Sequence, residues 1–316
     1  MKALFIICNN PNFDLVGYHA FNYFKEHYLL MLDKIDDELN VKTYKYKKDD
    51  NEYYFLLTCD HVMHHLKKYV NFLNDNFNDV DIVVHINYHA GANALDNILT
   101  VHKVGDIASA TFLPSMPMEA TRLLLSLKKY NDELNLGFTI TTETTHYSGV
   151  ASGSDPKELY EFKKPTYDLE IGSTTQAYEN KKAIIALCES AMRIFDKNFE
   201  TRLNVIYLGG PFFENTYTEA ILRNTYPIYY DNHLCQMMLE DIDYLNNSKE
   251  LIIDIIKKSF QTVDLIVYHD KVRKIKPILD EIYKEYGIPN VKHRALRNVN
   301  ENPELLKIFR EKMSRV

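Results

Sequence analysis

The 316-residue sequence has no apolar run that approaches the roughly 20 residues that a helix needs to cross a bilayer. It has only four cysteines, Cys8, Cys59, Cys188 and Cys235, and none has CxxC spacing. Three of them lie in apolar surroundings, so we expect reduced thiols and neither disulfides nor a cysteine-based zinc site. The apolar start of the chain lacks a cleavage-site pattern and favours a first strand over a signal peptide. We therefore expect a cytoplasmic protein with no membrane partner.

Several familiar catalytic motifs are also missing. The sequence contains no HExxH, no Walker loop, no GxGxxG and no GxSxG. With 46% hydrophobic and 26% charged residues the composition is that of a globular protein, which excludes disordered and fibrous chains. The length indicates two lobes, or one large α/β unit with an insertion.

The charge is unevenly distributed along the chain. The formal net charge is −7, which argues mildly against a protein that coats nucleic acid. Residues 257–316 nevertheless hold 14 Lys and Arg against 8 Asp and Glu, a net of +6. Two basic clusters lie in this segment, one at Lys271, Arg273, Lys274 and Lys276 and one at Lys292, His293, Arg294 and Arg297. They indicate either a solvated helix face or a local binding surface for a polyanion.

Short β-rich runs alternate with amphipathic helical stretches, which predicts an α/β fold with mixed or parallel sheets. The predicted strands are Lys2–Cys8, Tyr53–Thr58, Asp81–Asn87, Leu99–His102, Gly137–Thr142, Tyr167–Ile171, Asn204–Leu208, Leu265–Tyr268 and Asn290–His293. The predicted helices are Val62–Asn74, Met118–Tyr130, Thr175–Phe195, Thr218–Arg223, Leu234–Leu245, Ile275–Tyr286 and Pro303–Met313.

Three segments do not fit this alternation. The polar stretches 88–113 and 144–166 are predicted to hold long loops, which usually carry function in a domain of this size. The Lys, Asp and Asn run of residues 42–52 is predicted to be a solvated turn.

Five histidines lie at strand ends or strand-to-loop transitions, where α/β folds gather their sites: His85, His89, His102, His146 and His233. A neutral imidazole binds a metal or moves a proton near neutral pH, and a carboxylate orients it. Each of them taken singly is also explained as a structural residue, and only the set indicates a site. The histidines on or beside helical patterns, His19, His27, His61, His64 and His65, are assigned structural roles.

Glu143 precedes His146 by three residues. In an extended segment this spacing turns the two side chains to opposite faces. A shared role of Glu143 and His146 would therefore require a bend or a bulge in the chain.

Two glycine-containing turns are candidates for substrate contacts. Gly209 and Gly210 follow a predicted strand and precede a predicted helix that starts at Thr218 and Glu219, so their amides could cradle an anion. Gly172 and Ser173 end another strand just before a helix. An ordinary turn and an ordinary helix start explain the same residues.

The order of these segments resembles the archaeal and plant-type D-aminoacyl-tRNA deacylases, the D-tyrosyl-tRNA deacylase type 2 family. The matching segments run over most of residues 1–245: Cys59-Asp60-His61-Val62, His89, Leu99-Thr100-Val101-His102 with Gly105, Pro117-Met118, Thr142-Glu143-Thr144-Thr145-His146, Glu170-Ile171-Gly172-Ser173-Thr174, Gly209-Gly210, Thr218-Glu219 and the His233 region. The Thr-Val-His, Glu-x-Thr-His and Glu-Ile-Gly-Ser-Thr segments are specific in this order.

The chain departs from the family pattern at two places. Where the family has Thr-His-His-Gly-Pro, this chain has Thr145-His146-Tyr147-Ser148-Gly149. Where the family follows its Gly-Gly pair with a His-Tyr-Ala-Pro-Arg run, Phe212 stands in place of the histidine and Thr216 in place of the arginine. The chain thus looks like a divergent member, in which Glu214 is a candidate replacement for the lost histidine.

The resemblance implies a two-lobed α/β fold with sheets like those of phosphorylases and peptidyl-tRNA hydrolases. Residues 1–245 would form the catalytic region as two intertwined lobes, and the basic segment 246–316 would complete the fold. It also implies zinc, and hydrolysis of the ester of D-aminoacyl-tRNA to free D-amino acid and tRNA. We expect aminoacylated tRNA as the partner and a monomer without a stable protein partner. The alternatives are a catalytically impaired tRNA-binding relative and a small-molecule ester or amide hydrolase.

Under this reading each candidate residue has an expected role. His89, His102, Glu143 and His146 are the expected catalytic group. Zinc is expected at His102, His146 and His233. Substrate contacts are expected from Gly105, Gly172, Ser173, Gly209, Gly210, Thr218 and Glu219.

Overall fold

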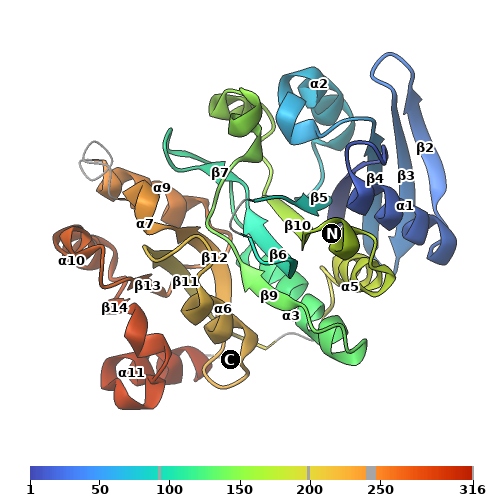
Figure 1. Ribbon diagram of the computed structural model, residues 1–316. Coiled ribbons are helices and arrows are strands. Elements are labelled where there is room, and N and C mark those ends of the chain that lie inside the picture. The colour runs from blue at the N-terminus through green and yellow to red at the C-terminus, as the bar shows by residue number, and fades with distance from the viewer. Residues whose placement is uncertain (92–93, 198–199, 240–246, 315–316) are drawn as a thin grey trace.

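The computed structural model describes residues 1–91, 94–197, 200–239 and 247–314, which form two β-sheets flanked by helices (Figure 1). The larger sheet has eight strands in the order β2-β3-β4-β1-β5-β10-β6-β9. Their bounds are β1 Lys2–Cys8, β2 Met31–Asp36, β3 Val41–Lys48, β4 Asn51–Thr58, β5 Ile82–His89, β6 Asn97–Lys103, β9 Thr139–Thr142 and β10 Thr166–Ser173. Two short strands, β7 Gly105–Asp106 and β8 Thr111–Phe112, pair with each other.

The centre of the larger sheet is parallel, because β4, β1, β5 and β10 all run in one direction. β6 runs antiparallel to β10, and β9 lies parallel to β6. Strands β1 and β5 are almost wholly buried, as expected for parallel strands covered on both faces. The carboxyl ends of β1, β4, β5 and β10 therefore meet at one edge of the sheet.

Helices cover both faces of the larger sheet. Helices α1 Leu15–His27, α3 Pro117–Glu133 and α5 Lys181–Ala191 pack on one face with the main hydrophobic core, and α2 Leu66–Phe77 packs on the other. Helix α3 also contacts the second sheet, since the backbone N–H of Tyr230 donates to the Thr121 hydroxyl at 2.7 Å. The two sheets are thus joined through a shared core.

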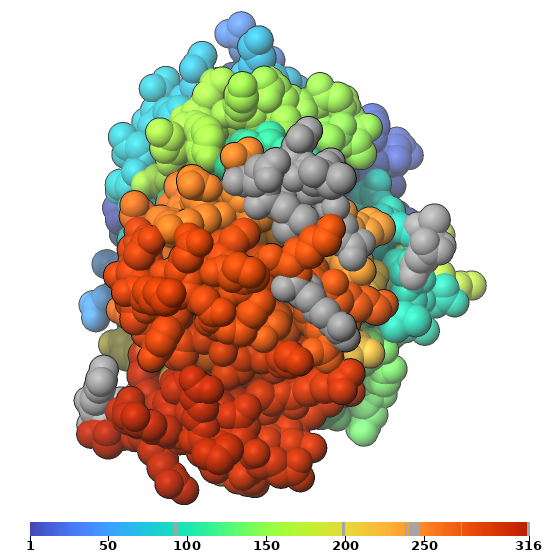
Figure 2. Space-filling model, turned by 90° about the vertical axis from the view of Figure 1, so that its left-hand side faces the viewer, coloured from blue at the N-terminus to red at the C-terminus, as the bar shows by residue number. Residues whose placement is uncertain are grey.

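The second sheet has four parallel strands in the order β12-β11-β13-β14. Its elements are β11 Leu203–Leu208, α6 Asn215–Leu222, β12 Ile228–Leu234, α7 Gln236–Leu239, α9 Ser248–Lys258, β13 Leu265–Tyr268, α10 Lys276–Tyr286, β14 Asn290–Lys292 and α11 Pro303–Met313. Residues 248–314 therefore add two strands to a sheet whose other two strands come earlier in the chain. They form one end of the molecule (Figure 2).

The predicted α/β class with mixed and parallel sheets is confirmed, and β1, β13 and α11 have the predicted bounds. The prediction of a solvated turn at residues 42–52 is wrong, because these residues form most of β3 and the start of β4. Strand β3, in which Lys and Tyr residues alternate, lies between β2 and β4. The sequence patterns did not predict α1, β2, β12 and α9.

The predicted helix Leu234–Leu245 is replaced by the end of β12 and by α7, and its residues 240–245 lie outside the described residues. The division at residue 245 stays a prediction.

Within the described part of the chain, no helix combines the length and the apolar character required to cross a bilayer. All four cysteines are free, as expected.

Candidate active site

The register of three neighbouring strands gathers titratable side chains into one buried row. His85 on β5 and His102 on β6 both stand opposite Asp168 on β10. Residues paired in this way point to the same face of a sheet, and all three are at most 5% exposed. The His102 Nε2 atom lies 3.2 Å from Oδ2 of Asp168. Burial opposes the charged form of His102, but the carboxylate of Asp168 outweighs it and raises the His102 pKa well above its usual value.

Glu170 lies two residues further along β10 and faces the same way. One of its carboxylate oxygens is 3.9 Å from His102 Nε2. Burial, helped by the neighbouring Glu143 charge, raises the pKa of Glu170 to about 7. Its Oε2 atom and the Nε2 atom of His85 are buried without a hydrogen-bond partner among the described residues. The row therefore has unused hydrogen-bonding capacity.

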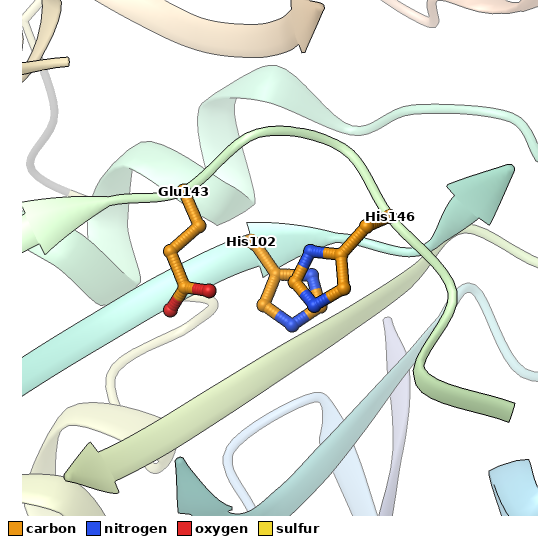
Figure 3. A group of neighbouring side chains, drawn as sticks. All are labelled: His102, Glu143 and His146. Carbon is orange, nitrogen blue, oxygen red and sulfur yellow. The ribbon is translucent and has the colours of Figure 1, made fainter. Parts of the chain in front are cut away.

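Glu143 and His146 join this row because the chain bends after β9. The strand ends at Thr142, and residues 143 and 146 form only isolated bridges, to Phe213 and Val104. The bend places the imidazole of His146 on that of His102, with ring centroids 3.8 Å apart (Figure 3). Glu143 lies beside both rings, so the expectation that a shared role requires a bend agrees with the structure.

His89 at the end of β5 forms the second pair of the site. Its Nε2 atom is 3.3 Å from Oε2 of the fully buried Glu143, and its Nδ1 atom is 2.9 Å from the Ser173 hydroxyl. Burial opposes the charged form of His89, but Glu143 raises its pKa overall. The lack of a side chain at Gly172 makes room, since a Cβ there would lie 2.8 Å from Cβ of His89. Gly172 and Ser173 thus position His89.

The proton positions on His146 follow from its hydrogen bond. Nδ1 of His146 lies 3.0 Å from the carbonyl oxygen of Thr144, which only accepts, so Nδ1 carries the proton and Nε2 has a free lone pair. Burial and the charge on His102 lower the His146 pKa to about 4. His146 is therefore neutral at physiological pH and can accept a proton or bind a metal.

Three overlapping groups in the site have the residue types and spacing to hold a metal ion. They are His102, Glu143 and His146; His89, Glu143 and Glu170; and His102, Asp168 and Glu170, in each of which the ligand atoms lie within 4.8 Å of one another. Two ligands of a tetrahedral zinc, each about 2.0 to 2.1 Å from it, lie about 3.3 Å apart. The His89–Glu143 separation of 3.3 Å matches this spacing in the second group, and the His102–Asp168 separation of 3.2 Å matches it in the third.

Two phenylalanines border the site on its partly exposed side. The ring of Phe212 lies 5.1 Å from that of His146, and the ring of Phe213 lies 5.7 Å from that of His89. Backbone contacts fix them, since Thr144 N–H donates to the Phe212 carbonyl at 2.9 Å and Phe213 bridges to Glu143. Phe212, which replaces a histidine of the family pattern, therefore packs against the site without contributing a ligand.

The structure does not bring His233 into any of these groups. Its Nε2 atom lies 3.0 Å from the carbonyl oxygen of Gly209, and its Nδ1 atom is buried without a hydrogen-bond partner among the described residues. Burial lowers the His233 pKa to about 4. Its own carbonyl oxygen accepts from the Thr144 hydroxyl and the Thr145 N–H, so the β12 strand supports the bend that carries His146.

Gly209 and Gly210 have left-handed backbone angles, with φ of 92° and 78°. The N–H of Gly209 donates to Leu234, and the side chain of Glu214 caps α6 through Thr216 N–H. The Gly209 amide is thus already used within the fold.

The remaining predicted substrate residues have different positions. The Thr218 hydroxyl contacts the backbone N–H and the hydroxyl of Thr142 at 3.1 and 3.0 Å, directly before Glu143. The N–H of Gly105 donates to the His146 carbonyl at 3.2 Å. A Cβ added to Gly105 would lie only 3.0 Å from Cγ2 of Thr145, so the two residues pack closely. Thr218 and Gly105 both support the segment of residues 142–146 that carries Glu143 and His146. Glu219 is exposed on α6 and, among the described residues, has no hydrogen bond or ion pair with the buried row.

Sequence reasoning missed Asp168 and Glu170 and gave His85 no role. The available signal was the run Tyr167–Ile171, where two acidic residues alternate with apolar ones in a predicted strand. Asp and Glu are almost never fully buried unless paired, so their position in a buried strand points to partners.

The predicted basic clusters are partly neutralised. Arg294 and Lys292 lie 2.6 and 3.6 Å from Asp270, Lys276 pairs with Asp280, and the Arg297 guanidinium donates to the Thr216 hydroxyl at 2.7 Å. The side chain of Arg273 lies outside the described part of the structure. Arg294 and Lys292 remain mostly exposed despite their pairing.

Buried imidazoles paired with carboxylates can act as general acids and bases, so the cluster is a candidate active site of an enzyme. Residues 76–291 match the sequence profile of the D-aminoacyl-tRNA deacylase family. The chain belongs to this family.

Individual relatives are distant. A D-aminoacyl-tRNA deacylase of Methanococcus vannielii is 27% identical over 254 residues, which cover 72% of this chain and 92% of that protein. A D-aminoacyl-tRNA deacylase of Cenarchaeum symbiosum is 27% identical over 145 residues, so that this chain spans only about half (52%) of that relative. The solved structure of AF0625, described as a conserved protein of unknown function, superposes with a TM-score of 0.74 at 17% identity and covers 94% of this chain and 96% of that one. It supports the fold alone.

Proposed function

We propose that this chain hydrolyses the ester bond of D-aminoacyl-tRNA at the buried cluster of His89, His102, Glu143 and His146. The observation that carries the proposal is the bend after β9, which brings Glu143 and His146 onto His102 and Glu143 onto His89. Membership of a family whose relatives are named D-aminoacyl-tRNA deacylase supports the substrate class. The reaction would take place in the cytoplasm and require a single copy of the chain.

In the proposed reaction, His146, His89 and His102 would each have a separate role. The free Nε2 lone pair of His146 would accept the proton of the attacking water. His89, held by Glu143 and Ser173, would return a proton to the 3′ oxygen of the leaving ribose. Asp168 and Glu170 hold His102 below His146, and the positive charge of His102 would favour the developing oxyanion.

The donor set also fits zinc, which prefers imidazole and carboxylate ligands in catalytic sites. Zinc is an alternative to the proton relay, because with the ion bound His102 and His146 would be neutral ligands and would carry neither the proton nor the positive charge assigned above. His102, Glu143 and His146 would hold the ion, and Asp168 would orient His102 as an outer carboxylate. A bound zinc ion would polarise the ester carbonyl and lower the pKa of water. His233 would serve as a support of the Thr144–Thr145 backbone and not as a ligand.

The test is single-turnover hydrolysis of D-Tyr-tRNA by the wild type and by His146→Ala and His102→Ala. We expect release of free tyrosine by the wild type and a loss of about 100-fold or more in each variant. Circular dichroism would verify that the variants are folded. A folded His146→Ala variant with the full rate would overturn its assigned role. A wild type that binds labelled tRNA but releases nothing would favour the impaired tRNA-binding relative.

Salt dependence separates the tRNA substrate from a small-molecule ester. Phosphate contacts make affinity fall steeply as salt rises, because bound counterions are released. We expect the KM for D-Tyr-tRNA to rise between 50 and 200 mM salt. A KM that does not change, combined with rapid cleavage of simple esters, would favour a small-molecule hydrolase.

A further inference from the structure

A row of four aromatic rings lies at the edge of the larger sheet where the parallel strands end. His64 and His61 come from the segment after β4, Tyr88 from the end of β5, and Tyr178 from α4 Thr175–Tyr178. Neighbouring ring centroids are 5.1, 5.6 and 5.5 Å apart along this order. All four side chains are partly exposed. We call these four residues the aromatic row.

The row lies beside the candidate active site at the same end of the sheet. Tyr88 immediately precedes His89 on β5, so their side chains point to opposite faces, and the Tyr178 hydroxyl donates to the His89 carbonyl at 2.8 Å. Within the row, the backbone of Phe13 interacts with the His61 ring, and the Phe13 side chain is 60% exposed. The row is therefore joined to the backbone of His89 at the end of β5.

Two buried polar atoms, Oδ2 of Asp14 and Nε2 of His61, lie beside the row, and we call this pair the Asp14–His61 gap. Asp14, which is 1% exposed, uses one carboxylate oxygen to cap α1 through Gly17 N–H at 2.8 Å, while its Oδ2 atom has no hydrogen-bond partner. The Nε2 atom of His61 also has none, and it lies 3.9 Å from that Oδ2. A hydroxyl oxygen about 2.8 Å from each atom would lie about 2 Å to the side of the line that joins them. Two buried polar atoms without partners thus face each other at a spacing that suits a hydroxyl group.

We propose that the aromatic row binds the unpaired 3′-terminal nucleotides of the RNA substrate and that the Asp14–His61 gap takes a ribose hydroxyl. The proposal rests on the proposed function, whose substrate ends in single-stranded nucleotides next to the reacting ester. Bases of single-stranded RNA stack on Phe, Tyr and His rings, and this stacking does not depend on sequence. The row lies on the same sheet edge as the reacting histidine, as required for nucleotides that adjoin the ester.

The test measures binding of a fluorescent single-stranded RNA tetranucleotide, ACCA, to the full chain. Variants Tyr88→Leu and His61→Leu each remove one ring of the row. Tyr286→Leu is the matched control, because Tyr286 lies 43% exposed at the end of α10. We expect Tyr88→Leu and His61→Leu each to weaken binding by about 10-fold or more, and the control to bind like the wild type. Thermal melting would confirm folding.

Unchanged affinity in folded Tyr88→Leu and His61→Leu would overturn the proposal, as would a wild type that does not bind ACCA. Full-length tRNA without its unpaired 3′ end should bind wild type and variants alike. A second variant, Asp14→Asn, removes the carboxylate but keeps the helix cap. We expect it to weaken the binding of ACCA more than the binding of the corresponding all-deoxy tetranucleotide. Hydrolysis of D-Tyr-tRNA is measured separately. Binding of ACCA that depends on the row, without hydrolysis by the wild type, would reject the proposed function and retain the nucleotide site.

Discussion

Asp168 and His102 stand directly opposite each other on β10 and β6, and their side chains meet at 3.2 Å with no exposure to solvent. The antiparallel register places them on one face, so the pair is fixed by backbone geometry and not by flexible side chains. This pair supports the stacked rings of His102 and His146, on which the proposed chemistry depends.

Asp168→Asn tests this support. The amide keeps the shape but removes the charge that faces His102, so we expect hydrolysis of D-Tyr-tRNA to fall about 10- to 100-fold and zinc affinity to fall similarly. The rate of tyrosine release and a metal titration would measure the two effects. Equal rates for Asp168→Asn and the wild type would show that His102 needs no carboxylate partner.

Glu143→Gln removes the one carboxylate shared by His89 and the His102–His146 stack. We expect a loss of about 100- to 10,000-fold in turnover, because His89 loses its partner and the metal group loses an anionic ligand. Glu133→Gln, an exposed residue on α3, is the control and should retain the full rate. A Glu143→Gln enzyme within threefold of the wild type would remove Glu143 from the mechanism.

Gly172→Ala tests the position of His89. A Cβ at residue 172 would lie 2.8 Å from Cβ of His89 and 3.1 Å from Ile98 Cγ1, so one of them must shift. We expect a loss of about 1 to 3 kcal/mol in the free energy of unfolding and a larger fractional loss of turnover. Gly137→Ala is a stability-matched control, because its φ of 74° is strained for alanine but nothing lies within 4 Å. If both variants lose activity in proportion to stability, Gly172 has no special link to His89.

The buried carboxyl group of Asp14, which is not part of the His85–His102–Asp168 row, predicts that the stability of the fold depends on pH. Burial raises its pKa to about 7 in the folded protein, against 3.8 for an ordinary aspartate. Between these values the folded state holds a proton that the unfolded state has lost, so stability falls as pH rises through this window. Because one pKa unit corresponds to about 1.4 kcal/mol, the loss is at most about 4 kcal/mol.

Asp14→Asn should abolish this pH dependence of stability. Asparagine caps a helix as well as aspartate does, so Gly17 N–H keeps its acceptor. We expect the variant to be more stable than the wild type at pH 8 and similar to it at pH 4, as measured by urea unfolding. Parallel pH profiles for the two proteins would contradict the raised pKa of Asp14.

The sequence alone predicted the α/β class, which the structure confirms, and it named His89, His102, Glu143 and His146, which the structure places close together while their catalytic roles stay a prediction. Strand ends and the resemblance pointed to these residues separately. Their association could not be predicted, because it depends on the bend after Thr142 and on the order β5-β10-β6, which no local pattern encodes. The same strand order brings Asp168 and Glu170 into the row.

His233 and His61 illustrate the limits of local reasoning. His233 lies at a strand end, as a site residue should, but β12 belongs to the second sheet and its ring turns to Gly209. His61 looked like a helix-associated structural residue, yet the chain returns it to the edge where β1 and β5 end, beside Asp14. In both cases tertiary topology decides what the side chain contacts.

The most direct test of the account is the release of tyrosine from D-Tyr-tRNA and from L-Tyr-tRNA by the purified wild type, before and after treatment with a zinc chelator. We predict rapid release from the D form alone, loss of this activity on chelation, and its return when zinc is added back. Chelator-resistant hydrolysis would reject the zinc proposal and leave the histidine–carboxylate chemistry. Intact ester in every sample, with tRNA still bound, would contradict the central claim that this site is a working deacylase.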